Sequence, residues 1–339
     1  MGVPSPRSDP RELAARPPAR GAVLDEKLLW ATSLAVLAPS THNTQPWRFQ
    51  LRGSGVELHA DGFRALPHLD PLGRELLISC GAALFNLQIA IRSLGLKTQT
   101  RVLPAGPDHS HVATVTVVGQ EEMTEQEARL VEAIPRRHTN RRPLDGERVS
   151  AELCFALQDV ASFEGAGLHL VSDAGTQHAI ARLIDEAERR QQADIDLRQE
   201  VAGWVRRPDD AAVDGLVAAA AAQAPPCAYA TSFQIRDFGV PPEEADWTSD
   251  RPVLAVLWTE RDTPLDWLCA GRAMEHLLLR ATADDVDASF LNQPIEIPAV
   301  RALVRDELRL PGVPQLVLRL GGAAVGPVTP RRSLDEVLR

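Results

Sequence analysis

The stretch APSTHNTQPW, residues 38–47, joins a predicted helix to a predicted strand and decides how the N-terminal region folds. Residues 24–37 carry apolar side chains at helical spacing, and Pro39 ends this helix because proline has no backbone N–H to donate. Pro46 is tolerated only at the start of a strand, and residues 47–60 predict a β-hairpin around a Gly-Ser-Gly turn. The sequence therefore places a rigid polar turn between a helix end and a sheet edge.

The polar side chains of this turn suggest a ligand. Asn43 and Gln45 each offer a donor and an acceptor on one planar amide, which suits a ligand rim that alternates C=O and N–H groups. The pyrimidine edge of a flavin is such a rim. The alternative is structural: Ser40 and Thr41 cap a turn, Asn43 forms an Asx turn, and Trp47 is a half-buried strand aromatic.

Length and charge limit the class of protein. The chain has 339 residues, 44% apolar and 24% charged, enough for one large domain or two packed halves. A net charge of −10 argues against a general nucleic-acid or anionic-membrane surface. Residues 1–22 are rich in Pro and Arg and lack the apolar core of a secretory signal, so we expect a flexible tail. No apolar run approaches membrane-spanning length, which predicts a cytoplasmic protein.

Cysteines and histidines give little sign of a metal. The cysteines are far apart and form no CxxC pair, so we expect them reduced and mostly packed in helices; they are Cys80, Cys154, Cys227 and Cys269. His109 and His111 alternate before a predicted strand, and a two-ligand metal site is conceivable there. A solvated strand entry is favoured because no third ligand lies close by in the sequence. We therefore predict no metal site.

The two parts of the chain repeat a pattern. Residues 77–96 and 267–286 each place a cysteine and a glycine at the head of a long apolar helix, and apolar strands follow at 112–118 and 315–321. The matched order favours descent from one duplicated unit over chance similarity. A helix-rich insertion at about 185–242 is expected to cover a cleft, and the alanine run within it to form a helix interior.

A basic segment, PRRHTNRRPLD, carries four arginines around a threonine. Guanidinium groups bind phosphate oxygens in bidentate fashion, and a hydroxyl adds a neutral donor. In an extended backbone Arg137, Thr139 and Arg141 share one side, whereas Arg136 and Arg142 face elsewhere. The segment thus predicts a cradle for a phosphomonoester, and the alternative is a set of surface arginines paired with carboxylates.

A second basic pair lies near the C-terminus, and other phosphate motifs are missing. Arg331 and Arg332 follow a predicted strand and a Gly-Gly turn. The chain has neither GxGxxG nor GxxxxGK(S/T), which excludes the usual nicotinamide-dinucleotide and nucleoside-triphosphate folds. It also lacks a GxSxG elbow, an HExxH helix and a calcium loop, and residues 284–287 are expected to be a helix end.

These motifs together resemble a known family. APSTHNTQPWRF, GRELLISCGAALFNLQIAIRSLG, RRHTNRRPL, DWLCAGRAMEHLLLRAT and TPRRSLDEVL, in this order from about residue 25 to 338, resemble the FMN-binding nitroreductase superfamily, specifically its Acg-type branch. The resemblance implies an α+β fold of two fused nitroreductase-like halves, each a mostly antiparallel sheet flanked by helices, forming an intramolecular pseudo-dimer. The expected boundaries are 23–134 for the first half and 135–339 for the second.

The resemblance also implies an FMN site where the halves meet. The phosphate contacts fall on Arg137, Thr139, Arg141, Arg331 and Arg332. The turn and the strand that follows it would touch the isoalloxazine and ribityl chain through Pro39, Ser40, Thr41, Asn43, Gln45, Pro46, Trp47, Arg48 and Phe49. A loop at 288–291, with Ser289 and Phe290, would aim a backbone N–H at the flavin. The first half lacks its own R-x-S-x-R segment and the second lacks the polar turn, so one composite site is expected instead of two.

The resemblance implies an oxidoreductase that passes electrons from NAD(P)H to nitroaromatic or quinone-type acceptors. The flavin carries the chemistry, so no catalytic side chain is predicted. The alternative is an FMN-storage protein whose flavin is sealed beneath a lid, with Trp204, Tyr229 and Phe233 as covering residues. A non-flavin scaffold is a third possibility. Fusion of the halves predicts a monomer or a weak homodimer.

Overall fold

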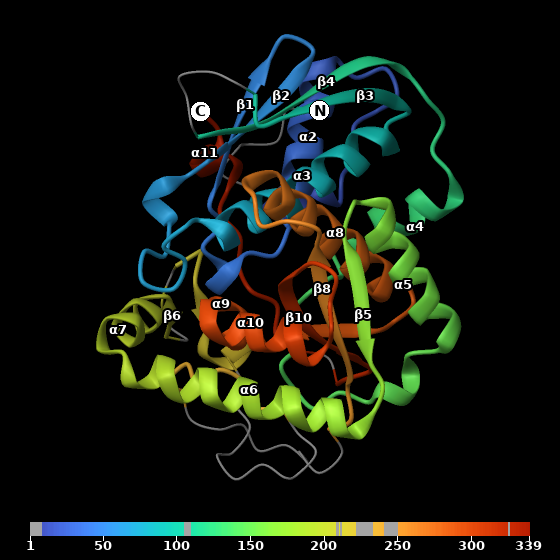
Figure 1. The fold of residues 1–339 in the computed structure, drawn as a ribbon. Coiled ribbons are helices and arrows are strands. Elements are labelled where there is room, and N and C mark those ends of the chain that lie inside the picture. The colour runs from blue at the N-terminus through green and yellow to red at the C-terminus, as the bar shows by residue number, and fades with distance from the viewer. Residues whose placement is uncertain are drawn as a thin grey trace.

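The computed structural model describes residues 9–104, 110–207, 210, 212–221, 233–240, 250–324 and 326–339. Two four-stranded antiparallel sheets lie on either side of two long helices, α3 (Arg74–Ser93) and α8 (Pro264–Ala283), which cross at the centre of the molecule (Figure 1). The main hydrophobic core runs through this crossing and joins both sheets. The α+β class and the antiparallel pairing are confirmed.

The first sheet follows the predicted hairpin. Its elements are α2 (Leu24–Ala35), β1 (Trp47–Arg52), β2 (Gly55–Ala60), α3, β3 (Leu96–Val102) and β4 (His111–Gln120), with strand order β1-β2-β4-β3. Trp47 pairs with Ala60 and Arg52 with Gly55, so the hairpin and its turn are confirmed. Trp47 and Phe49 alternate inward and are both 0% exposed, which fixes the register because a shift of one residue would expose them.

The second sheet has the same strand order in chain sequence. Its elements are α5 (Ala151–Phe163), β5 (Gly167–Val171), β8 (Val253–Thr259), α8, β9 (Asp287–Phe290) and β10 (Val313–Gly321), with strand order β5-β8-β10-β9. In both sheets, the first two strands are neighbours, a long helix follows, and the fourth strand lies inside the third. The loop predicted at 288–291 is thus largely strand β9, which pairs with β10.

Two glycines allow the central helices to touch. A Cβ on Gly81 would lie 2.3 Å from the carbonyl oxygen of Leu268, and a Cβ on Gly271 would lie 2.0 Å from that of Ile78. Any side chain at either position would therefore push the backbones apart. The repeated glycine that we used to align the two parts of the chain marks the point where the helices meet.

The remaining helices cover the sheets and the crossing. They are α1 (Pro10–Ala14), α4 (Glu125–Ala133), α6 (Ala174–Ala193), α7 (Ile195–Gly203), α9 (Gln293–Glu296), α10 (Pro298–Glu307) and α11 (Leu334–Val337), with short 3-10 turns η1 (Thr41–Asn43), η2 (Gly62–Arg64) and η3 (Gly146–Arg148). α6 and α7 lie along one end of the second half (Figure 1). The three described cysteines lie in α3, α5 and α8 as free thiols; Cys227 is outside the described residues.

The predicted insertion is only partly helical. The alanine run does not form the expected α-helix: its described part is β7 (Leu216–Val217), paired with β6 (Val205–Arg206), followed by a 3-10 turn, η4 (Ala218–Ala221). Tertiary contacts decide this segment in spite of its helix propensity.

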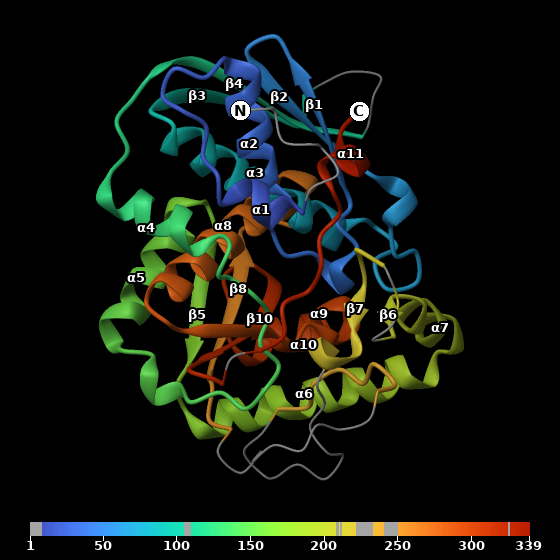
Figure 2. The ribbon, with the colours of Figure 1, turned by 180° about the vertical axis from the view of Figure 1, so that it is seen from behind.

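Both ends of the described chain pack against the first half. The backbone N–H of Arg339 donates to the carbonyl of Phe49 (2.9 Å), and α11 lies beside β1, as Figure 2 shows from behind. Part of the segment predicted as a flexible tail is ordered, because α1 packs on α2 with Leu13 and Ala14 buried, and residues 1–8 lie outside the described residues. Trp30 donates to the carbonyl of Ala14 (3.2 Å) and ties the two helices together.

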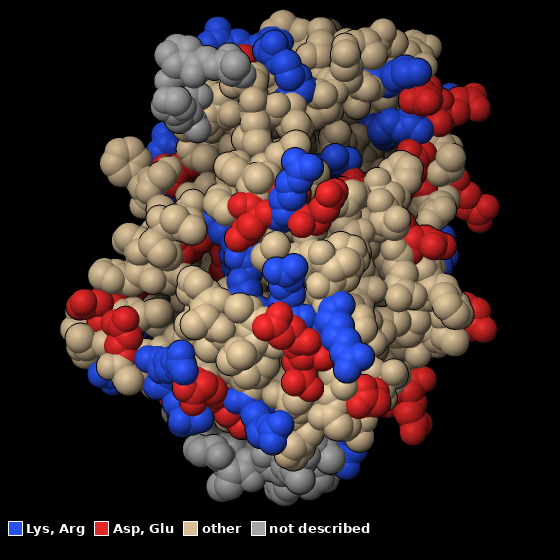
Figure 3. Space-filling model, viewed as in Figure 1, with Lys and Arg blue, Asp and Glu red and all other residues tan. Residues whose placement is uncertain are grey.

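Surface charge is mixed on the face that Figure 3 shows, and hydropathy corrects one statement made from the sequence. The face in Figure 3 carries acidic and basic side chains interspersed, without a broad field of one sign. Among the described residues, one helix, α3, is long and apolar enough to cross a membrane, so the statement that no run approaches this length was wrong. Its apolar window is 72% buried inside the protein, as expected of a core helix.

Candidate functional site

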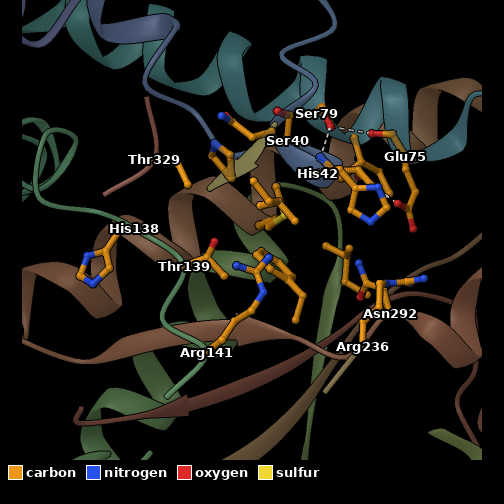
Figure 4. A pocket seen from close by; sticks show the side chains of 18 of the residues that line it. Ser40, His42, Glu75, Ser79, His138, Thr139, Arg141, Arg236, Asn292 and Thr329 are labelled. Carbon is orange, nitrogen blue, oxygen red and sulfur yellow. Dashed lines mark hydrogen bonds between the residues drawn. The ribbon is translucent and has the colours of Figure 1, made fainter. Parts of the chain in front are cut away.

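A cavity of about 100 Å³ lies where the two halves meet. Its walls come from the turn after α2, the start of α3, the segment after α4, strand β9, helix α9 and the C-terminal segment (Figure 4). The predicted site residues that line it are Pro39, Ser40, Thr41, Asn43, Arg137, Thr139, Arg141, Phe290 and Arg331. Residues far apart in the chain are thus brought together around one space.

The turn after α2 is strained and firmly held. His42, Asn43 and Gln45 have φ values of 50°, 55° and 50°, a left-handed conformation that costs energy for residues other than glycine. The backbone N–H of Gln45 donates to Ser40 Oγ (2.9 Å), and Thr41 Oγ1 donates to Glu75 Oε2 (2.8 Å). These bonds fix the turn against the first turn of α3.

The two amides of this turn bind other parts of the chain. Asn43 Nδ2 donates to the carbonyl of Gly215 (2.9 Å), and its Oδ1 accepts from Arg331 (3.1 Å). Gln45 Nε2 donates to the carbonyl of Val213 (2.9 Å), and its Oε1 accepts from the backbone N–H of Arg332 (2.8 Å). The amides therefore connect the turn to the covering segment and to the C-terminal arginines.

Three arginines form the basic end of the cavity. Arg137 and Arg331 are only 5% and 6% exposed, and the Nε atom of each has no hydrogen-bond partner among the described residues. Burial lowers the pKa of Arg331, and the neighbouring Arg137 lowers it further. Burial also lowers the pKa of Arg141 to about 10, with added repulsion from Arg236 and Arg319. Buried cations that repel one another make this end attractive to an anion.

The alternation predicted for the basic segment agrees with where its side chains lie. Arg137, Thr139 and Arg141 line the cavity, whereas Arg136 is exposed and pairs with Asp285 on the outside. Asn140, between them, donates its backbone N–H to the carbonyl of Ala288 in β9 (2.9 Å). The segment is held in an extended form against a strand, which places Arg136 and Arg137 on different sides. His138 departs from the alternation, because it also lines the cavity.

The other predicted site residues lie near the cavity without lining it; they are Gln45, Pro46, Trp47, Arg48, Phe49, Ser289 and Arg332. Trp47 and Phe49 belong to the core, and Arg48 pairs with Asp61 (2.9 Å). Arg332 donates to backbone carbonyls of Gln45 (3.3 Å) and Glu336. These residues support the turn from behind.

The opposite end of the cavity holds charged residues that the sequence did not reveal. Glu75 and Glu296 line it together with Arg236, Asn292 and Gln293 (Figure 4). Burial raises the pKa of Glu75 to about 7, and the nearby Glu296 raises it further. Glu296 forms a buried ion pair with Arg236. These residues carry no motif and come from three separate segments, so no local signal could have identified them.

Part of the insertion covers the cavity. Arg141 donates to the carbonyl of Ala220 (2.7 Å) and lies 5.2 Å over the ring of Phe238, which also meets His42 edge-on. Leu216, Ile235, Arg236 and Phe238 line the cavity from this side. Small-molecule pockets are typically ~300–1,000 Å³, so this covered cavity must widen to admit a drug-sized ligand.

Of the aromatic residues expected to cover the flavin, the two that the structure describes do not line the cavity. Trp204 lies outside the cavity lining, between the guanidinium groups of Arg64 and Arg206, and Phe233 packs in the core beside β8 and β10. Tyr229 is outside the described residues. Phe238, which was not predicted, is the aromatic that covers the basic end.

His111 has closer neighbours than its sequence position suggested. Its ring stacks on His59 (4.7 Å between centroids), and Glu57 lies close enough that all three could share an ion. Arg52 and Arg339 also contact this group, with Arg339 3.4 Å from His59 Nδ1. Glu57 and His59 are thus two potential metal ligands near His111, which contradicts the argument that no further ligand lies close by. The cationic side chains of Arg52 and Arg339 flank this group. His109 is outside the described residues.

Several known proteins with similar sequences are named as NAD(P)H nitroreductases. A candidate NAD(P)H nitroreductase of Mycobacterium tuberculosis, Rv3131, is 33% identical over 316 residues, covering 90% of this chain and 89% of its own. A second protein of that organism, acg, also named as a candidate NAD(P)H nitroreductase, is 28% identical over 322 residues, covering 91% and 93%. A solved nitroreductase with bound FMN from Bacteroides fragilis has 16% identity and a TM-score of 0.38, covering 62% of this chain and 95% of its own. The chain matches no family model.

Proposed function

The chain belongs to the Acg-like branch of the nitroreductase superfamily, and from this we propose that it is an FMN-dependent oxidoreductase using NAD(P)H. The premise rests on 33% identity across nine-tenths of the chain. The proposed acceptors are nitroaromatic or quinone-type compounds. Binding of FMN to this chain is part of the proposal.

The observation that carries the proposal is the basic end of the cavity. Arg137 and Arg331 are buried, Arg141 is half-buried, and all three line the cavity with Thr139. Arg137 repels Arg331, and Arg236 and Arg319 repel Arg141. Guanidinium groups with a neutral hydroxyl match the oxygens of a phosphomonoester, and a bound dianion would offset their repulsion. Within the described part of the chain, the Nε atoms of Arg137 and Arg331 have no hydrogen-bond partner and could donate to a ligand.

The residues present would divide the binding between phosphate and ring. Arg137, Thr139, Arg141 and Arg331 would hold the phosphate, and the turn from Pro39 to Asn43 together with Phe290 would line the space beyond it. FMN, when bound, supplies the hydride-transfer chemistry. The chain itself orients the ligand and excludes water from the cavity.

A duplicated origin explains why the site has two unlike walls. Both sheets have the same strand order, and the central helices meet at corresponding glycines. We infer that two nitroreductase-like units were fused, with the polar turn retained in the first and the basic segment retained in the second. The short link from α5 to β5 has no room for a turn like residues 38–46.

A second candidate function, FMN storage, is favoured by the cover. Asn43, Gln45 and Arg141 are all hydrogen-bonded to carbonyls of residues 213–220, and Phe238 closes the basic end. A cover held by the site residues themselves would keep nicotinamide away from a bound flavin. The protein would then retain FMN with little or no turnover.

One experiment separates the two functions. The FMN-loaded protein is mixed anaerobically with excess NADPH and, separately, NADH, and the flavin absorbance is followed. The oxidoreductase predicts prompt bleaching by one nucleotide or both, because hydride transfer reduces the flavin. Flavin that stays yellow with both nucleotides but bleaches with dithionite supports storage. Protein that takes up no FMN contradicts both functions.

A further inference from the structure

A carboxyl group that the proposed function does not use lies next to the basic end. Glu275, in the middle of α8, is 0% exposed, and neither carboxyl oxygen meets a donor at good hydrogen-bond geometry among the described residues. Its Oε1 lies 3.8 Å from Arg137 Nε, which also lacks a partner. Buried charges normally have good hydrogen-bond geometry, so this loose pair requires an explanation.

The charged groups that face Glu275 are few. Arg137 approaches from the segment after α4 and Arg331 from the C-terminal segment, and both act on its charge. From α3, the neutral amide of Asn86 interacts with the carboxyl group and lowers its pKa, and the Oδ1 atom of Asn86 has no hydrogen-bond partner among the described residues. On α8 itself, the next residue, His276, faces away toward Glu164 (3.1 Å). Burial raises the pKa of Glu275 to about 7, although Arg137 lowers it.

The acid is present in one half only. Glu275 stands four residues after Gly271, and the corresponding residue after Gly81 is Phe85, which stacks on His276 (4.6 Å). The second half, which contributes Arg137 and Arg331 to the cavity, therefore has a buried acid at this position of its long helix. The first half has an apolar residue at the corresponding position. This asymmetry points to a role at the basic end rather than in the helix crossing.

We propose that Glu275 and a bound phosphomonoester share Arg137 as their counter-ion, so that Glu275 takes up a proton when the anion binds. This inference rests on the proposed FMN site. A dianion in the cavity contacts the cavity face of Arg137 and places negative charge near Glu275 in a dry interior, where a second carboxylate charge is costly. Protonation removes that charge and turns the carboxyl group into a hydrogen-bond donor, beside the acceptor Oδ1 of Asn86. Glu275 is thus a positioning residue for Arg137, and affinity for the anion falls as the pH rises above neutral.

The sign and size of this effect follow from linkage. A group that gains a proton on binding weakens binding at pH values above its pKa in the free protein, by up to tenfold per pH unit. For FMN we expect a loss of affinity of roughly tenfold between pH 7 and pH 8.5. The FMN phosphate is already a dianion in this window because its second pKa is about 6. Arg141, with a pKa of about 10, remains charged.

The test measures FMN affinity and proton uptake between pH 6.5 and 8.5. FMN is titrated into the full-length apoprotein by flavin fluorescence, and calorimetry in two buffers of different ionisation enthalpy counts the protons bound. The wild type should show the falling affinity and, near pH 8, uptake of close to one proton per FMN. Riboflavin, which lacks the phosphate, should show neither.

Two variants locate the effect. E275Q keeps the shape of the side chain but cannot titrate, so its FMN affinity should be nearly flat across the window. E164Q changes another buried carboxyl beside α8, paired with Arg272 and His276, and should keep the wild-type slope. If wild-type FMN binding is tight but shows no pH slope and no proton uptake, the inference is wrong and the FMN site stands. If no FMN binds at any pH, the proposed function fails and this inference fails with it.

Discussion

Arg136 and Arg137 are adjacent in the sequence but lie in different electrostatic environments. Arg136 points outward to Asp285 and remains solvated, whereas Arg137 is buried between the cavity and Glu275. An exposed ion pair contributes little, ~0–1 kcal/mol, because water screens it and side-chain ordering opposes it. A buried guanidinium that receives an anion has a much larger effect, so this pair is a matched test of the site.

Replacing Arg137 with Ala should weaken FMN retention at least tenfold, since a hydrogen bond to a charged group contributes ~1.5–3 kcal/mol. The measurement is the flavin content after dialysis, together with the FMN dissociation constant. R136A is the matched control and should retain flavin as the wild type does. Equal losses in R136A and R137A would contradict the conclusion that Arg137 faces the cavity and Arg136 faces away from it.

For single residues, the sequence predicted the position of a side chain where that position depends only on neighbouring residues in the chain. Arg137, Thr139 and Arg141 could be placed on one side because an extended strand alternates its side chains. The partners of Asn43 and Gln45 could not be predicted, because the carbonyls they bind are about 170 positions away. Glu75 and Glu275 look like ordinary polar residues of helices, and only the packing around them makes them unusual.

Among the elements, the segment that covers the cavity contacts the first half through the carboxylate of Asp214. Asp214 accepts hydrogen bonds from Arg206 (2.9 Å) and forms an ion pair with Arg64 of the first half. The neighbouring carbonyls of Val213 and Gly215 are those that Gln45 and Asn43 bind. Loss of Asp214 therefore removes one attachment of the cover, beside the hydrogen bonds from Asn43, Gln45 and Arg141, and leaves the basic end intact.

We expect D214A to raise the rate of FMN release several-fold, because a loosened cover opens more often. Its free energy of unfolding should fall by only about 1 kcal/mol, as is usual for partly exposed pairs. Stopped-flow flavin fluorescence after dilution measures the rate. E186A, which breaks ion pairs with Arg189 and Arg190 on the outer face of α6, is the control. Identical release rates in D214A, E186A and wild type would show that this segment does not limit exchange.

Helices and strands with clear periodicity were predicted well. The helix before Pro39, the hairpin, and the strands around 112–118 and 315–321 are all confirmed. The helix predicted for the alanine run was wrong, because the pairing of β7 with β6 outweighs the high helix propensity of this segment. The prediction of a flexible N-terminal tail was wrong for α1. Leu13 and Ala14 pack on an apolar surface of α2, which a local sequence pattern cannot show.

For the whole molecule, the crossing of α3 and α8 sets the distance between the two halves and therefore the width of the cavity. The backbones approach so closely at Gly81 and Gly271 that even a methyl group has no space. The contact lies inside the continuous core shared by both sheets, so strain there cannot be relieved at the surface.

Replacing Gly271 with Ala should therefore lower the melting temperature by several degrees, since overpacking costs ~1–3 kcal/mol. Differential scanning fluorimetry of the apoprotein measures this change without any contribution from ligand. Gly62→Ala is the control, because a Cβ there meets nothing within 4 Å. A G271A protein as stable as G62A would mean that the helices can separate without cost.

The polar turn and the basic segment belong to a single polypeptide, on opposite walls of the same cavity. In a flavoprotein assembled from separate subunits, dilution pulls the walls apart, and the ligand is lost together with the partner. Here the second wall is covalently tethered to the first, so its effective concentration does not depend on how much protein the cell contains. Occupancy of this cavity by the proposed FMN should therefore not fall when the protein is diluted at constant free FMN.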